Sequence, residues 1–476
     1  MNLNFTPYSE IRSLSCAHMV LRLTRADFEN VEFKDGRSVL PFFNCFFEKL
    51  TIINEDEIPF ETISIAFFNC LLPEIQIEII SSLNITLGFY GSFVSGKIAN
   101  ANLKGVDINN CLTPTSLFLI DVPQVQIRFT KENFDQSLWQ SLFIQYYIVE
   151  QARTLLENDI KFYIYDPKNL LISSNFESNE DPFKPEIALS MNSGQEHNKT
   201  EIKGMSLNVL SISGNPAGNL LLEDIKIKSW YIHNFSPSGT VSLHSIGPIT
   251  LADTENKIGI HNSKLDNVEF DNISFDNYDI ISLYRTKFSR AVFTSCDFPK
   301  DYKTFSKFVP IKNVHYPDEK PDNYAKAQYE IFLQLKKAVE DRGNYYEAQK
   351  LQAISHEALR QIKSISWYDR RILDINNWSN NHGLSVKRPL VGFFLISIPL
   401  YILYLVSINK IFISSDFDAS LIGYYFAFID ITHRSDFLVG KSDFGWWTLI
   451  IDYIAKITVG FFIYQFIAAF RKYGKR

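Results

Sequence analysis

The chain has 476 residues and a net charge of −6, and 46% of its residues are hydrophobic and 14% aromatic. This length allows two or three domains with separate cores. The weak acidity excludes a polycation that coats nucleic acid along its whole length, although a local basic site stays compatible with it. The five cysteines are widely scattered with no CxxC pair, so they predict reduced, buried thiols rather than disulfides or a metal site.

Short β-rich runs repeat with similar content from about residue 10 to 125. The runs PFFNCFF (41–47) and AFFNCLL (66–72) place their Phe-Asn-Cys triplets 25 residues apart. Repetition of short strands without helical spacing indicates a solenoid of stacked coils.

The repeat is clearest at 263–298, where bulky residues recur at intervals of five. These residues are Leu265, Phe270, Phe275, Phe288, Phe293 and Phe298. Smaller residues stand two positions before four of them, namely Val268, Ile273, Ala291 and Cys296. In a quadrilateral β-helix, each five-residue side points one bulky residue inward. The segment resembles the pentapeptide-repeat family, which implies a right-handed β-helix; an ordinary β-sandwich with coincidental spacing is the alternative.

The pattern therefore predicts a cytoplasmic β-solenoid sensor domain over 1–318, with a helical insertion near 131–157. Three prolines between 310 and 321 mark its end. A helical hairpin and juxtamembrane connector is predicted over 319–388, because apolar residues recur at helical spacing on both sides of Arg342-Gly343-Asn344. The hairpin is similar to one tetratricopeptide-type helix pair, and a plain connector is an equal alternative.

The end of this connector interleaves aromatic and basic residues. The candidates for ligand binding are Trp367, Tyr368, Arg370, Arg371, Lys387 and Arg388. Such a segment can lie along lipid headgroups, with its aromatic rings at the membrane interface. Alternatively, the rings stack on bases while the cations bind phosphates of a single-stranded nucleic acid.

Two apolar stretches, 389–408 and 446–470, are long enough to cross a bilayer and define a transmembrane domain over 389–476. Lysine and arginine flank both stretches on the same side, and the N-terminus contains no apolar signal segment. We therefore expect both termini in the cytoplasm and the protein in the inner (cell) membrane of a bacterium. The apolar stretch 419–431 is too short to span and is interpreted as a re-entrant half-helix.

One face of the second stretch carries the pore-lining candidates Thr448, Asp452, Lys456 and Gly460. Asp452 and Lys456 are four residues apart and can pair. Ionisable groups in a span are costly and usually face a bundle interior or a water-filled path. The alternative is a static ion pair that holds subunits together. Two helices cannot enclose a pore, so a channel requires a homo-oligomer.

Patterns of catalysis are lacking in the sequence. The segment Gly91–Lys97 satisfies GxxxxGK, but Ile98 follows where a P-loop needs Ser or Thr, so we expect a turn between coils. We find no HExxH, nucleophile elbow or dinucleotide-binding turn, and the histidines lack ligand spacing. The sequence therefore predicts no enzyme activity, no cofactor and no metal.

The closing run TVGFFIYQFIAAFRKYGKR (458–476) and the run DRGNYYEAQ (341–349) resemble bacterial pentapeptide-type membrane proteins with a two-span channel end. The whole plan is most similar to the membrane effectors of Hailong anti-phage systems. This resemblance implies a tetrameric, ligand-gated ion channel that depolarises the membrane during abortive infection. It also implies gating by single-stranded DNA oligomers made by a nucleotidyltransferase partner. The alternative function is a membrane-tethered solenoid scaffold that recruits protein partners without channel activity.

Overall fold

A computed structural model describes most of the chain, which divides into two compact units. The first unit comprises Met1–Phe298 with Ser306–Tyr316, and the second comprises Pro299–Phe305 with Pro317–Arg476. The described residues are 2–4, 11–23, 38–54, 63–79, 85–99, 103–131, 141, 160–176, 184–192, 196–249, 255–299, 307–309, 321–408, 410, 420–438 and 445–470. The helix predicted near 131–157 falls almost wholly outside them.

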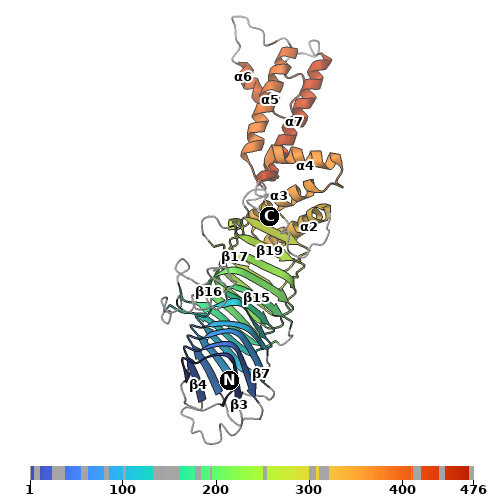
Figure 1. Ribbon diagram of the computed structural model, residues 1–476. Coiled ribbons are helices and arrows are strands. Elements are labelled where there is room, and N and C mark those ends of the chain that lie inside the picture. The colour runs from blue at the N-terminus through green and yellow to red at the C-terminus, as the bar shows by residue number, and fades with distance from the viewer. Residues whose placement is uncertain are drawn as a thin grey trace. The chain divides into compact units, whose positions relative to one another are not determined.

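The first unit is a parallel β-solenoid, which confirms the predicted fold class (Figure 1). Most coils contribute one strand to each of two parallel stacks. One stack begins with β2 (Ile11–Arg12), β4 (Ser38–Phe43), β6 (Ile63–Phe68), β8 (Ile85–Tyr90), β10 (Leu103–Asn109), β12 (Gln124–Phe129) and β14 (Asn169–Ser174). The other begins with β1 (Asn2–Asn4), β3 (Ser15–Leu23), β5 (Phe46–Asn54), β7 (Leu71–Ile79), β9 (Phe93–Ala99), β11 (Thr113–Ile120), β13 (Ile160–Tyr165) and β15 (Glu186–Met191).

Two long strands, β16 (Lys199–Gly214) and β17 (Asn219–Phe235), then run through both stacks. The first stack continues through β18 (Val241–Gly247), β20 (Val268–Asp271) and β22 (Val292–Thr294), and the second through β19 (Lys257–His261) and β21 (Ile280–Tyr284). All of these pairings are parallel, so each coil presents its backbone groups to the next one.

Inward side chains stack like on like because successive coils pair in register. The rings of Phe42, Phe67 and Phe89 lie above one another, with centroids 4.9 and 5.3 Å apart. All three are fully buried. Alternate residues along each strand point into the core, as the period of two in a strand requires.

The Phe-Asn-Cys triplets are corners of this solenoid. Asn44 and Asn69 both adopt the left-handed conformation, with φ of 54°, which asparagine tolerates better than most residues. The next residue, Cys45 or Cys70, turns into the core as a free thiol. These corners bond to each other, since Cys45 N–H donates to Cys70 Sγ (3.4 Å) and Cys70 N–H donates to Ser92 Oγ (3.0 Å). The GxxxxGK segment likewise forms a corner at Gly91 (φ 58°), followed by strand β9.

Five of the six bulky residues spaced at 263–298 are buried as predicted, and the sixth, Phe293, is half-buried. Phe270 is buried and stacks on Phe293 of the next coil at 4.9 Å, and Phe275 stacks on Phe298 at 5.3 Å. This coil is 23 residues long, from Phe270 to Phe293. Coil length varies elsewhere, for example 22 residues from Ile63 to Ile85. Regular five-residue sides are thus a local feature of this segment, which also contains the short 3-10 helix η2 (Phe275–Asn277).

The second unit is helical. The hairpin is formed by α2 (Pro321–Asp341) and α3 (Tyr345–Gln361), which pack against each other. Asn344 caps α3 by accepting a hydrogen bond from the Glu347 N–H (3.2 Å). Helix α4 (Trp367–Asn380) starts at the Ser366 cap and ends at Asn381, which is left-handed (φ 56°).

Helices α5 (Lys387–Ser407) and α7 (Trp446–Phe470) are long and apolar enough to cross a membrane. Only 22% and 28% of their most apolar windows are buried, whereas a core helix of a soluble protein is mostly buried. The two helices run side by side, with the short α6 (Ser420–Phe428) beside α5 (Figure 1). Gly392 permits close packing, since a Cβ there would lie 2.6 Å from the Phe462 ring.

Candidate functional site

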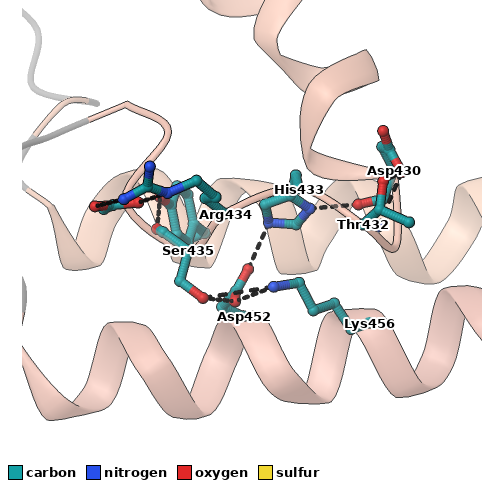
Figure 2. Close-up of polar contacts among 9 residues, drawn as sticks. Asp430, Thr432, His433, Arg434, Ser435, Asp452 and Lys456 are labelled. Carbon is teal, nitrogen blue, oxygen red and sulfur yellow. Dashed lines mark hydrogen bonds and ion pairs between the residues drawn. The ribbon is translucent and has the colours of Figure 1, made fainter.

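The most polar cluster of the apolar helices is centred on Asp452 of α7 (Figure 2). Its carboxylate is completely buried and has three partners. His433 Nε2 lies 2.7 Å from Oδ1, and Ser435 Oγ donates to Oδ2 at 2.6 Å. Lys456 Nζ lies 3.0 Å from Oδ2 and also donates to Ser435 Oγ at 3.4 Å. Three donors from two segments thus converge on one carboxylate, which is what a buried anion requires.

His433 and Ser435 belong to residues 429–438, the segment that follows α6; we call it the return segment. It begins with a turn in which the Thr432 N–H and hydroxyl both donate to Asp430 Oδ1, at 2.9 and 2.7 Å. The Tyr404 hydroxyl of α5 donates to the Ser435 carbonyl at 3.0 Å. The return segment is therefore held by both long helices, and its own turn aims His433 at α7 (Figure 2).

Aromatic and small apolar side chains close off this network. Tyr404, Phe428 and Ala455 are buried in one hydrophobic cluster with parts of α5, α6 and α7. The ring of Phe437 stacks on Tyr404 at 5.7 Å and meets His433 edge-on at 4.9 Å. Electrostatic interactions are stronger in such a dry environment, and an unpaired charge is correspondingly more costly there.

The structure brings the predicted pore-lining residues onto one face of α7, and that face contacts the return segment. Asp452 and Lys456 form the expected ion pair, and Thr448 is buried as well. A Cβ at Gly460 would lie 3.7 Å from Ile431 Cδ1. Asp452 and Thr448 are thus covered by other parts of the same chain, and their role as pore-lining residues stays a prediction.

Sequence reasoning missed His433 and Ser435 as partners of Asp452. The available signal was the polar run Thr432–Ser435 directly after an apolar stretch too short to span. Where a half-helix ends inside a bilayer, the backbone N–H and C=O groups after its last turn lack helical partners. Polar side chains at that point are then expected to bond to the neighbouring helices.

The predicted ligand-binding residues do not form one compact site. Trp367 and Tyr368 lie at the start of α4, both exposed, with ring centroids 3.9 Å apart. Arg370 donates to the Ile362 carbonyl at 3.4 Å, and Arg371 lies 4.0 Å from Asp374. These groups surround the first turns of the helix.

The other two basic residues lie beyond the far end of α4. Lys387 begins α5 and is exposed. Arg388 donates to the Asn377 carbonyl at 3.1 Å and to Asn381 Oδ1 at 3.4 Å, so it caps the C-terminal end of α4. A helix of 14 residues is roughly 20 Å long, so the two groups of cations are separated by most of that length.

Helix α4 also exposes an apolar face. Its most exposed large residues are Trp367, Tyr368, Ile372, Ile375 and Trp378. Together with α5 directly after it, this face suits a position at a membrane interface, where tryptophan and tyrosine are enriched.

Metal chemistry is not indicated by the described residues, which contain no group of three or more His, Cys, Asp or Glu side chains arranged to hold an ion. Comparison with known proteins found no matching family model, no matching curated protein and no matching solved structure.

Proposed function

We propose that this chain is one subunit of an oligomeric ion channel, with the β-solenoid as its cytoplasmic sensor. The observation that carries the proposal is the return segment. It follows a half-helix of nine residues and meets α7 at Asp452, roughly 10 Å along that helix from Trp446. Non-helical backbone at this depth is tolerated where it is buried in protein or lines water.

The distribution of polar and apolar side chains supports this proposal. Large apolar side chains of α5 and α7 are exposed in the single chain, among them Leu395, Ile398 and Ile457. The charged side chains of the return segment include Arg434, which pairs with Asp436 at 3.2 Å and is largely exposed. A ring of subunits would bury part of the apolar surface and gather copies of this polar segment around one axis.

The ligand and the biological role extend the same proposal. We propose that single-stranded DNA oligomers made by a nucleotidyltransferase partner gate a tetramer, and that opening depolarises a bacterial inner membrane during phage infection. The resemblance of 341–349 and 458–476 to such membrane effectors supports this part. Flanking lysine and arginine support cytoplasmic termini.

Electrical recording tests the channel directly. We expect the purified full chain to conduct ions in a planar bilayer, and Arg434→Glu to shift the reversal potential toward cation selectivity under an ion gradient, because it reverses a charge on the return segment. Arg290→Glu makes the same charge change at an exposed position of the solenoid and should leave the reversal potential unchanged. Intact oligomers that never conduct would refute the channel and favour the tethered scaffold.

A further inference from the structure

The helical unit contains a second polar site, a cavity of about 630 Å³ away from the Asp452 network. It lies among the α2–α3 hairpin, the end of α4 with the turn after it, and the C-terminal part of α7. The polar side chains that line it include Gln349, Gln352, Asn376, Asn380 and Gln465. Its volume is in the range typical of small-molecule sites, roughly 300 to 1,000 Å³.

Hydrogen bonds hold the walls of this cavity in place. The buried Asn380 Nδ2 donates to Gln465 Oε1, which ties the end of α4 to α7. Asn380 Oδ1 accepts from the Gly383 N–H at 2.8 Å, and Gln349 Nε2 donates to the His382 carbonyl at 3.2 Å. The site is therefore preorganised by three separate elements.

The described residues of the lining have almost no net charge. Lys336 Nζ lies 3.7 Å from Glu340 Oε2, so the lysine and the carboxylate of the lining offset each other. The rings of His356 and His382 lie 5.1 Å apart at one wall. Burial lowers the pKa of both, that of His382 to about 4, so both are neutral at pH 7. Among the residues that the structure describes, no arginine lines the cavity, which disfavours a phosphate or carboxylate as the main recognition element.

The remaining chemistry is that of side-chain amides beside aromatic rings. The amides of Gln352 and Asn376 take no part in the bonds that hold the walls. Each of them presents a donor and an acceptor next to each other, which is the pattern that reads the edge of a heterocyclic base. Tyr345 and Tyr464 add flat faces to the lining. His356 Nδ1 is buried and has no hydrogen-bond partner among the described residues, so it can bond to a ligand.

We propose that this cavity binds a small, uncharged, planar heterocycle of the nucleobase or nucleoside class. Because it contacts the hairpin, α4 and α7 together, the bound molecule would link the connector to the end of a membrane helix. This proposal does not depend on ion conduction, and a failed bilayer recording would leave it standing.

Calorimetric titration of the purified full chain in detergent tests the proposal, with adenosine, guanosine, cytidine and uridine as separate probes. We expect at least one to bind with a Kd below about 1 mM. Gln352→Leu should weaken that binding about fivefold to tenfold, the loss expected for one hydrogen-bonding partner. Gln361→Leu is the control, because it makes the same change at an exposed position of the same helix, outside the lining.

Gln352→Glu is a second, size-matched variant that replaces the amide donor by a charge and should also weaken binding. The proposal is overturned if none of the four nucleosides binds below about 1 mM, or if both Gln352 variants bind like Gln361→Leu. Tighter binding of adenosine monophosphate than of adenosine would overturn the assignment of a neutral ligand.

Discussion

Replacing Asp452 by asparagine removes the charge on which three donors converge. His433, Ser435 and Lys456 all lie within 3.0 Å of its carboxylate oxygens, and the carboxylate is completely buried. Hydrogen bonds to a charged group contribute about 1.5–3 kcal/mol each. Asparagine keeps one oxygen and the same shape, so the loss is smaller than their sum. Breaking a buried ion pair by removing one partner costs about 3–5 kcal/mol, and we expect Asp452→Asn to fall in that range.

The double variant separates the charge from the shape. Asp452→Asn with Lys456→Met removes both charges, so no buried ammonium is left without its carboxylate. We expect it to recover at least half of the loss of the single variant. Thermal unfolding of the detergent-solubilised chain measures this, since a loss of 3–5 kcal/mol corresponds to a fall in Tm of about 10 °C for a domain of this size.

Tyr453→Phe is the matched control, because Tyr453 neighbours Asp452 on α7 and is 60% exposed. The reasoning is refuted if Asp452→Asn unfolds at the same temperature as this control. It is also refuted if the double variant is no more stable than Asp452→Asn alone.

Three further predictions concern the solenoid, the connector and the ligand. Phe293 is half-buried and stacks on Phe270, so Phe293→Asp should place a charge against stacked rings and cost about 1–3 kcal/mol, whereas Thr294→Asp at the next, exposed position of β22 should not; equal Tm values would contradict the inward register. Burial lowers the pKa of His382 to about 4, against about 6.5 in the unfolded chain. Its contribution to the free energy of unfolding is therefore complete above about pH 6.5. That contribution is lost as the pH falls toward 4, by about 1.4 kcal/mol per pH unit. The denaturation midpoint of His382→Asn should therefore change less between about pH 7.5 and 5 than that of the unaltered chain. Asparagine is chosen because it tolerates the left-handed backbone at this position (φ 53°). An unchanged dependence of the midpoint on pH would exclude His382 as the cause. Binding of a single-stranded DNA oligomer should weaken steeply with salt, and Arg371→Gln with Lys387→Gln should flatten that dependence if these cations contact phosphates; an unaltered slope would leave them as lipid contacts only.

The solenoid was predictable because its core repeats within the sequence. Coils that stack in register place similar side chains at similar positions. The five-residue spacing from Leu265 to Phe298 therefore predicted which side chains face the core. The Phe-Asn-Cys triplets repeat in the sequence, but their spacing alone does not predict that their asparagines adopt a left-handed conformation and form corners. Strands β16 and β17 were not foreseen as elements of both stacks, because alternation alone does not show where a long strand bends.

The Asp452 site was only half predictable for a related reason. The pairing with Lys456 follows from helix geometry, since residues four apart share a face. The contacts with His433 and Ser435 span 19 and 17 residues, and they depend on how an irregular segment returns to the helix. No period in the sequence encodes that path.

The in-register pairing of coils of unequal length has a consequence for how such a protein can evolve. Strand β12 pairs with β14 in unbroken register from Gln124–Asn169 to Phe129–Ser174, although the chain takes 45 residues to return there, against 18 between Ile85 and Leu103. Extra sequence between one corner and the next strand therefore leaves the pairing of neighbouring coils unchanged. Loop closure adds only about 0.6 kcal/mol for each doubling of length, so the cost of such an excursion is small. Sequence of a different length could therefore replace the residues between β12 and β13 without any change in the pairing of the coils on either side.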